Sequence, residues 1–183
     1  MTQLLPIDEL NVLTSQIKGA ERLERDVLVD NILDFLIYSY TLGNDAVNAS
    51  YEIGQEVNID QLKESIYKRI KDKNFVERLD EYIKTNDRDG IVRVADTEMH
   101  RNYNQAIYDT AKDSGIKFRK KWSTMRDDKV RETHDYLEGT EVDLDSEFVT
   151  FDGDSAKFPG DFSRAENNVN CRCVIDLVLN DSE

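Results

Sequence analysis

Cysteine, histidine and proline are all scarce in this chain, with two of each among 183 residues. The two cysteines, Cys171 and Cys173, stand one residue apart near the end. The N-terminus lacks the basic start and long apolar run of a secretory signal peptide. Two cysteines without an export signal indicate the reducing cytoplasm, so a disulfide-stapled fold is not expected.

Long apolar runs and positive charge are also in short supply. The longest apolar stretch, "ILDFLIYSY", is interrupted by Asp34 and is too short to span a bilayer, so no membrane association is predicted. The chain has 24 Lys and Arg against 38 Asp and Glu, a net charge of -14. This balance argues against broad non-specific binding to nucleic acid, although it leaves room for a local basic patch.

Several common catalytic and binding motifs are missing. The sequence has no Walker loop, no Gly-x-Ser-x-Gly and no His-Glu-x-x-His. The stretch "DGDSAKFPGDF" resembles a calcium loop in its alternating Asp and Gly, but it lacks the closing Glu of an EF-hand. A cysteine–histidine nucleophile pair remains formally open, with no recognisable third member.

Apolar residues at helical spacing fill the first half. They predict helices over residues 8–17, 21–51, 60–73 and 74–84, with a kink at Gly43 inside the second. Asn58 or Asp60 can cap the third helix. The polar break "TNDRDG" at 85–90 is the best boundary candidate. It divides a helical N-terminal region, 1–86, from a second unit, 87–183.

The second half changes in pattern. One long helix is predicted over 91–113, and a shorter one over 126–137. Apolar–polar alternation predicts strands within "IKFRKKW", "EVDLDSEFVTF" and "CVIDLVL", and 151–162 reads as a loop. The expected fold class is therefore α+β, an N-terminal helical bundle or extension followed by a small α+β domain with a short, mainly antiparallel sheet.

Both histidines and both cysteines lie in this second half. His100, His134, Cys171 and Cys173 could supply four zinc ligands, but their spacing matches no standard finger. A Cys-x-Cys pair on a strand directs both thiols to one face, which suits either shared metal ligation or shared packing. Both interpretations stay open, with packing favoured.

Other polar residues share helix or strand faces. In the predicted helix 126–137, Asp127, Arg131 and His134 fall on one face, either as a polar cluster reaching into a site or as an ordinary ion pair beside a satisfied histidine. A buried Glu98 facing Arg131 would be an expensive charge that needs its partner.

A basic strand is a candidate nucleic-acid or phosphate contact, and its side chains are Lys117, Arg119, Lys120 and Lys121. Lys120 shares a face with the aromatic residues Phe118 and Trp122. The acidic residues from Glu138 onward are the expected neighbours of these bases in the alternative, purely structural interpretation.

Taken in order, "ADTEMHRNYNQA", "KKWSTMRDDKVRETHDYLEG", "FVTFDGDSAKFPGDF" and "NVNCRC" resemble the C-terminal domain of phage Mu F-like minor head proteins. The resemblance covers about 90 residues. The matching positions are Thr97, Glu98, Trp122, Asp127 or Asp128, Arg131, His134, Gly139, Phe148, Pro159, Asn170, Cys171, Arg172 and Cys173.

The resemblance implies a non-enzymatic head morphogenesis protein of a tailed phage or prophage. Its implied partners are the portal protein, capsid or scaffold proteins and packaged DNA, and its implied location is the capsid interior, after assembly in the host cytoplasm. If a metal is bound, zinc on Glu98, His134, Cys171 and Cys173 is the implied set. The alternative is a metal-dependent enzyme or toxin-associated domain with Glu98 and His134 as acid and base.

Overall fold

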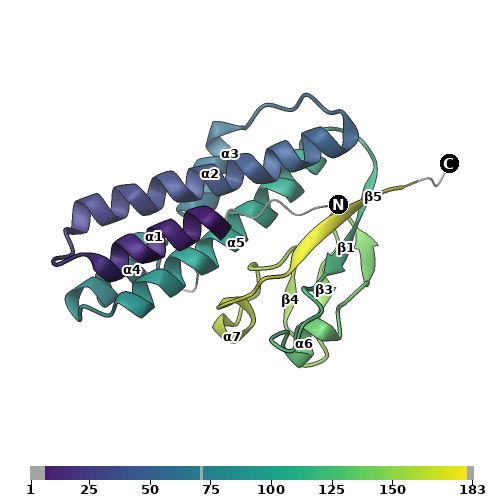
Figure 1. Cartoon of the computed structure of the whole chain (residues 1–183). Coiled ribbons are helices and arrows are strands. Elements are labelled where there is room, and N and C mark those ends of the chain that lie inside the picture. The colour runs from purple at the N-terminus through teal and green to yellow at the C-terminus, as the bar shows by residue number, and fades with distance from the viewer. Residues whose placement is uncertain (1–6, 71, 181–183) are drawn as a thin grey trace.

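The structure, a computed structural model, describes residues 7–70 and 72–180. Long helices form one part of the molecule, and a small sheet with short helices forms the other (Figure 1). The helices of the first part are α1 (Ile7–Gly19), α2 (Arg25–Tyr51), α3 (Ile59–Ile66), α4 (Phe75–Lys84) and α5 (Arg88–Asp113). The predicted α+β class, helical first and antiparallel later, is confirmed.

The second part contains β1 (Phe118–Ser123), α6 (Glu132–Asp135), β2 (Glu141–Asp143), β3 (Phe148–Val149), β4 (Ser155–Ala156), α7 (Ala165–Asn168) and β5 (Val174–Leu179). Strand β1 lies between β2 and β5 in a three-stranded antiparallel sheet, with Trp122 opposite Ile175 and Lys120 opposite Leu177. Strands β3 and β4 pair separately. The chain thus returns at its end to complete the sheet beside β1.

Helix starts follow the side-chain chemistry of their first residues. The Asn58 side chain accepts from the backbone of Asp60 and Gln61, which caps α3. Asn74 and Glu77 form a reciprocal capping box on α4. Asp87 accepts from the backbone N–H of Gly90, so α5 begins inside the predicted polar break. Helix α3 ends at Ile66, shorter than the predicted 60–73.

Helix α2 runs continuously through Gly43, as the predicted helix over 21–51 requires. This glycine is a point of close contact, because an added Cβ would lie 2.4 Å from the carbonyl oxygen of Tyr103 on α5. One prediction about helices was wrong. Of the predicted helix over 126–137, only Glu132–Asp135 is helical. Arg126 has a positive φ of 53°, which is incompatible with a helix that begins at this residue.

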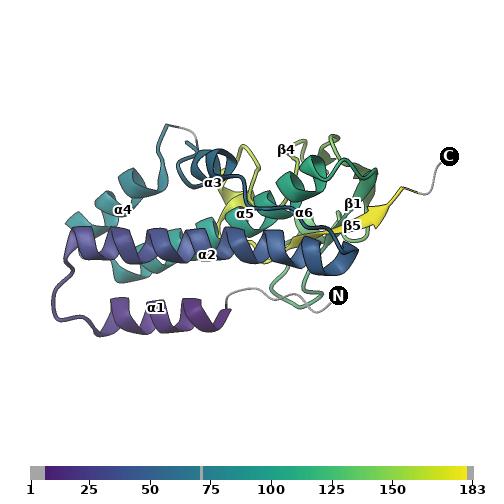
Figure 2. The same ribbon diagram turned by 90° about the horizontal axis from the view of Figure 1, so that it is seen from above.

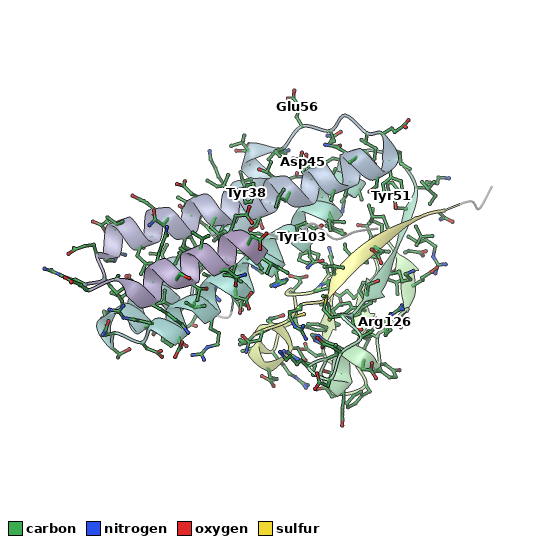
Figure 3. The ribbon with its side chains drawn as sticks, in the orientation of Figure 1. Tyr38, Asp45, Tyr51, Glu56, Tyr103 and Arg126 are labelled. Carbon is green, nitrogen blue, oxygen red and sulfur yellow. The ribbon has the colours of Figure 1, made fainter. Side chains whose placement is uncertain are left out.

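Helix α5 contributes to both hydrophobic cores. Its first half, including Ile91 and Met99, packs with α1 to α4, and its second half, including Tyr103 and Ile107, packs with the sheet. Helix α2 runs alongside α5, and its last residue, Tyr51, donates a hydrogen bond of 2.5 Å to the carbonyl oxygen of Leu177 on β5 (Figures 2 and 3). The division at residue 86/87 stays a prediction, and α5 ties the two parts together across it.

No helix among the residues 7–70 and 72–180 is long and apolar enough to cross a membrane.

Candidate functional site

Three chemically reactive side chains meet between α6 and the segment before β5: His134, Cys171 and Cys173, here called the thiol–histidine cluster. The Nδ1 atom of His134 lies 3.5 Å from Sγ of Cys171 and 3.4 Å from Sγ of Cys173. All three are buried, each at most 3% exposed. Within the described residues, it is the one group of three or more His, Cys, Asp or Glu side chains placed to share a metal ion.

The backbone around the two thiols is held by hydrogen bonds on both sides. Cys171 N–H donates to the carbonyl of Asn168 at 3.1 Å, and Asn170 takes a positive φ of 56° in the turn between them. From α5, the Asn104 amide donates to the carbonyl of Cys173 at 3.2 Å and accepts from Ile175 N–H at 3.0 Å. Both thiols consequently face His134, as the Cys-x-Cys alternation predicts, although β5 itself begins at Val174.

Aromatic rings enclose His134. Phe162 stacks on its imidazole, with ring centroids 5.4 Å apart, and Trp122 meets it edge-on at 5.3 Å. The Nε2 atom of His134 has no hydrogen-bond partner among the residues that the structure describes. Nδ1 is therefore the ring nitrogen that faces the two sulfurs, and the tautomer of the imidazole sets whether it donates or accepts there.

The two thiols shift each other's pKa in opposite directions. A hydrogen bond from Cys173 holds the pKa of Cys171 well below its usual value, and His134 adds to this effect. The same pairing and burial raise the pKa of Cys173.

A small cavity of about 10 Å³ adjoins the cluster, and it is lined by Met125, Lys129, Val130, Arg131, His134, Asn170, Cys171, Arg172 and Cys173. This is about the space that one water molecule needs. Arg172 is turned away from the thiols into a two-pronged ion pair with Asp127, at 2.7 Å for both contacts. The carboxylate of Asp127 is thus engaged by Arg172, and Asp128 is exposed to solvent.

Arg131 has a different role from the one predicted. Its guanidinium donates to the backbone carbonyl of Val169 at 2.6 Å and to that of Glu166, so it fastens the loop leading to the thiols. The expected shared helix face of Asp127, Arg131 and His134 does not form, because only residues 132–135 are helical. The expected partnership of Arg131 with Glu98 was also wrong.

Glu98 lies in a second buried polar group with Arg78 and Arg101, here called the ion cluster. Its carboxylate accepts from Arg78 at 2.5 Å and from Arg101 at 2.8 and 3.0 Å. Burial raises the pKa of Glu98, but the two guanidiniums outweigh this and hold the pKa below its usual value. Arg101 also donates to the carbonyl of Ser65 on α3 at 2.5 Å. Glu98 is not among the three members of the thiol–histidine cluster.

The remaining signature residues have local structural environments. Thr97 is buried on α5, and its hydroxyl has no partner among the described residues. Gly139 has a positive φ of 74°, and its N–H donates to the carbonyl of Trp122 at 2.9 Å. Neither residue belongs to the thiol–histidine cluster or lines its cavity.

Lys120, on the predicted basic strand, is fully buried, with its Nζ 5.2 Å from the centre of the Tyr108 ring and 5.4 Å from that of Phe148. Burial, with a contribution from Lys157, lowers the pKa of Lys120 to about 8. Arg119 pairs with Glu141 and Asp143 on β2, as the acidic-neighbour interpretation predicts. Lys117 is exposed and Lys121 is half-buried.

Two important side chains were missed by sequence reasoning. Asn104 joins α5 to the thiol segment, and its signal was a polar amide among apolar residues of a long helix. Asp154, in the loop that resembled a calcium site, is 3% exposed and accepts hydrogen bonds from Ser163, Arg164 and Asn167. Its carboxylate organises the loop, and these hydrogen bonds hold its pKa below the usual value against burial.

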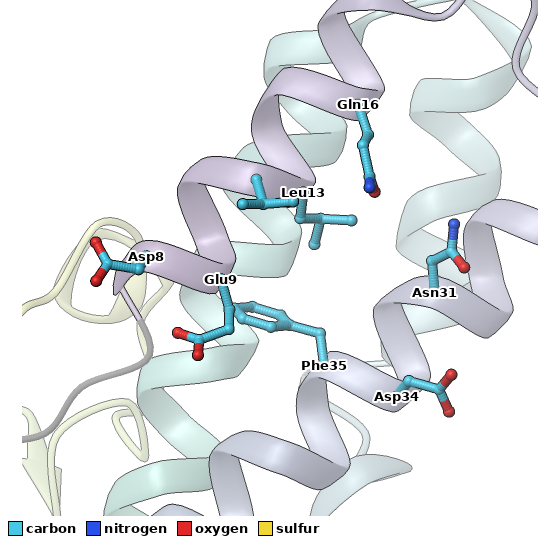
Figure 4. A pocket seen from close by; sticks show the side chains of 8 residues that line it. Asp8, Glu9, Leu13, Gln16, Asn31, Asp34 and Phe35 are labelled. Carbon is cyan, nitrogen blue, oxygen red and sulfur yellow. The ribbon is translucent and has the colours of Figure 1, made fainter.

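A separate groove of about 370 Å³ lies between α1 and α2 (Figure 4). Leu13 and Phe35 form its apolar floor, and Glu9 and Asp34 lie at its edge. It is remote in sequence from the signature, and nothing in the structure indicates its occupant.

The ordered signature residues indicate a class of phage-related proteins. The family model described as "Phage Mu protein F like protein" matches residues 53–176. This chain belongs to that family, as its resemblance in sequence predicted.

Two curated proteins are similar over shorter stretches. One is the NAD(+)–arginine ADP-ribosyltransferase EFV of Enterococcus faecalis, 46% identical over 86 residues, which are 45% of this chain and 18% of that protein. The other is minor head protein GP7 of Bacillus phage SPP1, 31% identical over 64 residues, or 35% of this chain and 21% of that protein. The chain thus aligns with about a fifth of each. No solved structure matches it.

Proposed function

We propose that this protein is a minor head protein of a tailed phage or prophage, which joins the assembling head through the portal and coat or scaffold proteins. The observation that carries the proposal is the family match over residues 53–176, together with the similarity to a minor head protein of phage SPP1. By this account the protein resides in the virion, on the inner side of the capsid, after assembly in the host cytoplasm.

The arrangement of the signature residues supports an assembly role over catalysis. Arg131, Gly139 and Asn170 hold backbone segments in place, and the cavity beside the thiols has room for about one water molecule. Pockets that bind substrates of ordinary size measure roughly 300–1,000 Å³. A site of this size is suited to maintaining a fold that other proteins recognise.

Co-expression with the portal protein of the same phage or prophage tests the proposal directly. The chain is expected to co-purify with the portal and to appear, at a few copies per particle, in mass-spectrometric counts of purified virions. Deletion of the gene is expected to reduce the yield of filled heads. Normal infectious particles without this protein in them would contradict the assignment.

A second candidate function is a metal-dependent enzyme or toxin-associated domain. The similarity to a segment of an ADP-ribosyltransferase favours it. The placement of Glu98 weighs against the specific acid–base assignment, because both carboxylate oxygens are engaged by Arg78 and Arg101. Transfer of label from adenylate-labelled NAD to an arginine-rich acceptor would support this candidate, and absence of transfer would favour the assembly role.

Direct contact with packaged DNA is a further, weaker element of the proposal. Lys120 is buried under aromatic rings, so Lys117 and Lys121 are the strand lysines left to meet phosphate. The test is therefore the double variant with Lys117→Glu and Lys121→Glu, which leaves the buried Lys120 unchanged. Salt-dependent retention of DNA that falls in this double variant would support the contact. Equal retention by variant and wild type would reject it.

A further inference from the structure

We propose that His134, Cys171 and Cys173 form a binding site for a zinc-class divalent metal ion, with the fourth coordination position open to a water molecule or a small anion. The inference rests on the side-chain geometry and stands independently of the role in head assembly. It differs from the four-residue set that the sequence suggested, because Glu98 belongs to the ion cluster.

The distances between the three donor atoms match a tetrahedral metal centre. Zinc binds cysteine sulfur at about 2.3 Å and histidine nitrogen at about 2.0–2.1 Å. In a tetrahedron with these bond lengths, sulfur and nitrogen are separated by about 3.5 Å. The observed separations from His134 Nδ1 are 3.5 Å to Cys171 and 3.4 Å to Cys173, and the two sulfurs lie within 4.8 Å of each other. The nitrogen–sulfur separations therefore match those of a tetrahedral zinc site.

The cluster is also held in this geometry by its surroundings. Asn104 binds the backbone on both sides of Val174, at the Cys173 carbonyl and the Ile175 N–H, and Phe162 and Trp122 pack against the imidazole. A metal ion would therefore meet ligands that have already lost most of their conformational freedom, which lowers the entropy cost of binding.

Charge and ligand type narrow the choice of ion. Two thiolates and a neutral imidazole balance a divalent cation, so the loaded centre is neutral and can be buried. Sulfur ligands select zinc and related metals over calcium and magnesium, which require oxygen. Asp127 is paired with Arg172, which lies on the cavity wall, through two contacts of 2.7 Å.

The cavity gives the site its open position. Its volume of about 10 Å³ adjoins all three ligands and matches one water molecule. Lys129 and Arg131 lie on its wall, so the surroundings favour a fourth ligand that carries negative charge, such as hydroxide or a small anion. A metal here also joins α6 to the segment before β5 through direct bonds, which couples its binding to the stability of the sheet.

Metal analysis of the full-length, untagged chain tests the site. Purified protein is expected to carry close to one zinc per chain. After chelation, addition of cobalt(II) should give the near-ultraviolet thiolate charge-transfer band and the intense visible bands of a tetrahedral cobalt–thiolate centre. X-ray absorption should show two sulfur ligands at about 2.3 Å together with nitrogen or oxygen ligands at about 2.0–2.1 Å.

Variants assign the metal to these three residues. Cys171→Ser, Cys173→Ser and His134→Asn should each lose the cobalt charge-transfer band or reduce its intensity, with at least a tenfold drop in zinc affinity. His100→Asn is the matched control, because it removes the chain's only other histidine, which is also buried. Its zinc content should equal that of the wild type.

If a variant fails to fold, metal removal and reloading of the wild-type chain still test the site, because these steps need no substitution. Folded wild-type protein that takes up no zinc or cobalt would overturn the proposal. A mass two hydrogens lower, which indicates a Cys171–Cys173 disulfide in freshly purified and zinc-free protein, would overturn it as well. So would cobalt spectra that persist in Cys171→Ser and Cys173→Ser.

Discussion

The ion cluster and the thiol–histidine cluster differ in how completely their polar atoms are hydrogen-bonded. In the ion cluster, the carboxylate of Glu98 is matched by two guanidiniums, and Arg101 makes a further bond to the Ser65 carbonyl. In the thiol–histidine cluster, each sulfur approaches Nδ1 of His134, and the other ring nitrogen of His134 has no partner among the described residues.

The difference separates a structural group from one prepared for a ligand. Burying a charge is tolerated when every hydrogen-bonding position is filled, and the ion cluster meets this condition across α3, α4 and α5. The thiol–histidine cluster brings one nitrogen and two sulfur atoms within 4.8 Å of one another, beside a cavity of one-water size. Both groups are buried, so burial alone does not distinguish their roles.

Breaking the ion cluster is expected to have the largest effect. Glu98→Gln leaves two guanidiniums without their counter-charge and should lower the free energy of unfolding by about 3–5 kcal/mol. Urea denaturation near neutral pH measures the change. Glu141→Gln, which removes a partly exposed partner of Arg119, is the control and should cost at most about 1 kcal/mol.

The pH dependence sharpens the same test. The pKa of Glu98 is lower in the folded protein than in the unfolded chain, so its stabilising contribution is complete above the unfolded value of about 4.3 and is lost as pH falls through the folded value. The stability difference between wild type and Glu98→Gln should therefore shrink in acid. A difference that is independent of pH down to about 2 would contradict the ionised ion cluster.

Asn104→Ala is expected to have the next largest effect, because it removes the link between α5 and the thiol segment. The carbonyl of Cys173 and the N–H of Ile175 lose their partner in the protein interior, at a cost of about 1–3 kcal/mol. The variant should also lower zinc affinity, unlike Glu98→Gln. Hydrogen exchange at Ile175 measures the loosening, and unchanged protection there would contradict the assigned role.

Gly43→Ala tests the packing between α2 and α5, which spans both parts of the molecule. The new Cβ would lie 2.4 Å from the Tyr103 carbonyl and 2.8 Å from the Ala106 Cβ, so overpacking should outweigh the gain in helix propensity. We expect a net loss of about 1–2 kcal/mol in thermal or chemical unfolding. Gly54→Ala, with nothing within 4 Å, is the control. Stabilisation by Gly43→Ala would contradict this close contact.

Lys120→Met should produce the smallest change in the free energy of unfolding, and it should raise this free energy where the other variants lower it. Lys120 is another buried polar residue. Its Nζ has no hydrogen-bond partner among the described residues, although this atom lies over two aromatic rings. The pKa of about 8 is below the unfolded value, so the charge opposes folding at neutral pH and this cost disappears as pH rises towards about 10.

The variant is accordingly expected to be more stable by up to about 1 kcal/mol near pH 7, once the lost ring contacts are counted, with a smaller advantage at about pH 10. Denaturation of both proteins across this range measures it. A variant that is less stable than wild type near neutrality would show that the ring contacts outweigh the burial cost.

Sequence pattern predicted the helical half, the strands β1 and β5 and the family, because these depend on local periodicity and on residue order. Alternation also placed both cysteines on one face and Lys120 on the face of Trp122. The helix over 126–137 was predicted wrongly, because Arg126 has a positive φ and Asp127 forms its ion pair with a residue 45 positions away.

The composition of the candidate site required three-dimensional information. Glu98 and His134 are both buried and both polar, and nothing in the sequence shows that Arg78, twenty residues before Glu98, takes its carboxylate. Asn104 similarly reaches Cys173 across 69 residues. Which buried polar side chains find hydrogen-bond partners depends on contacts between residues far apart in the sequence. Local sequence patterns carry no information about these contacts.

The most direct test of the contrast between the two clusters is the stability of the metal-free wild-type chain as free zinc is raised. If the thiol–histidine cluster binds one zinc in the folded state, the free energy of unfolding should rise by about 1.4 kcal/mol for each tenfold increase in zinc above the dissociation constant. The same rise should appear in His100→Asn and vanish in Cys171→Ser. Unfolding that is indifferent to zinc in the wild-type protein would contradict the account.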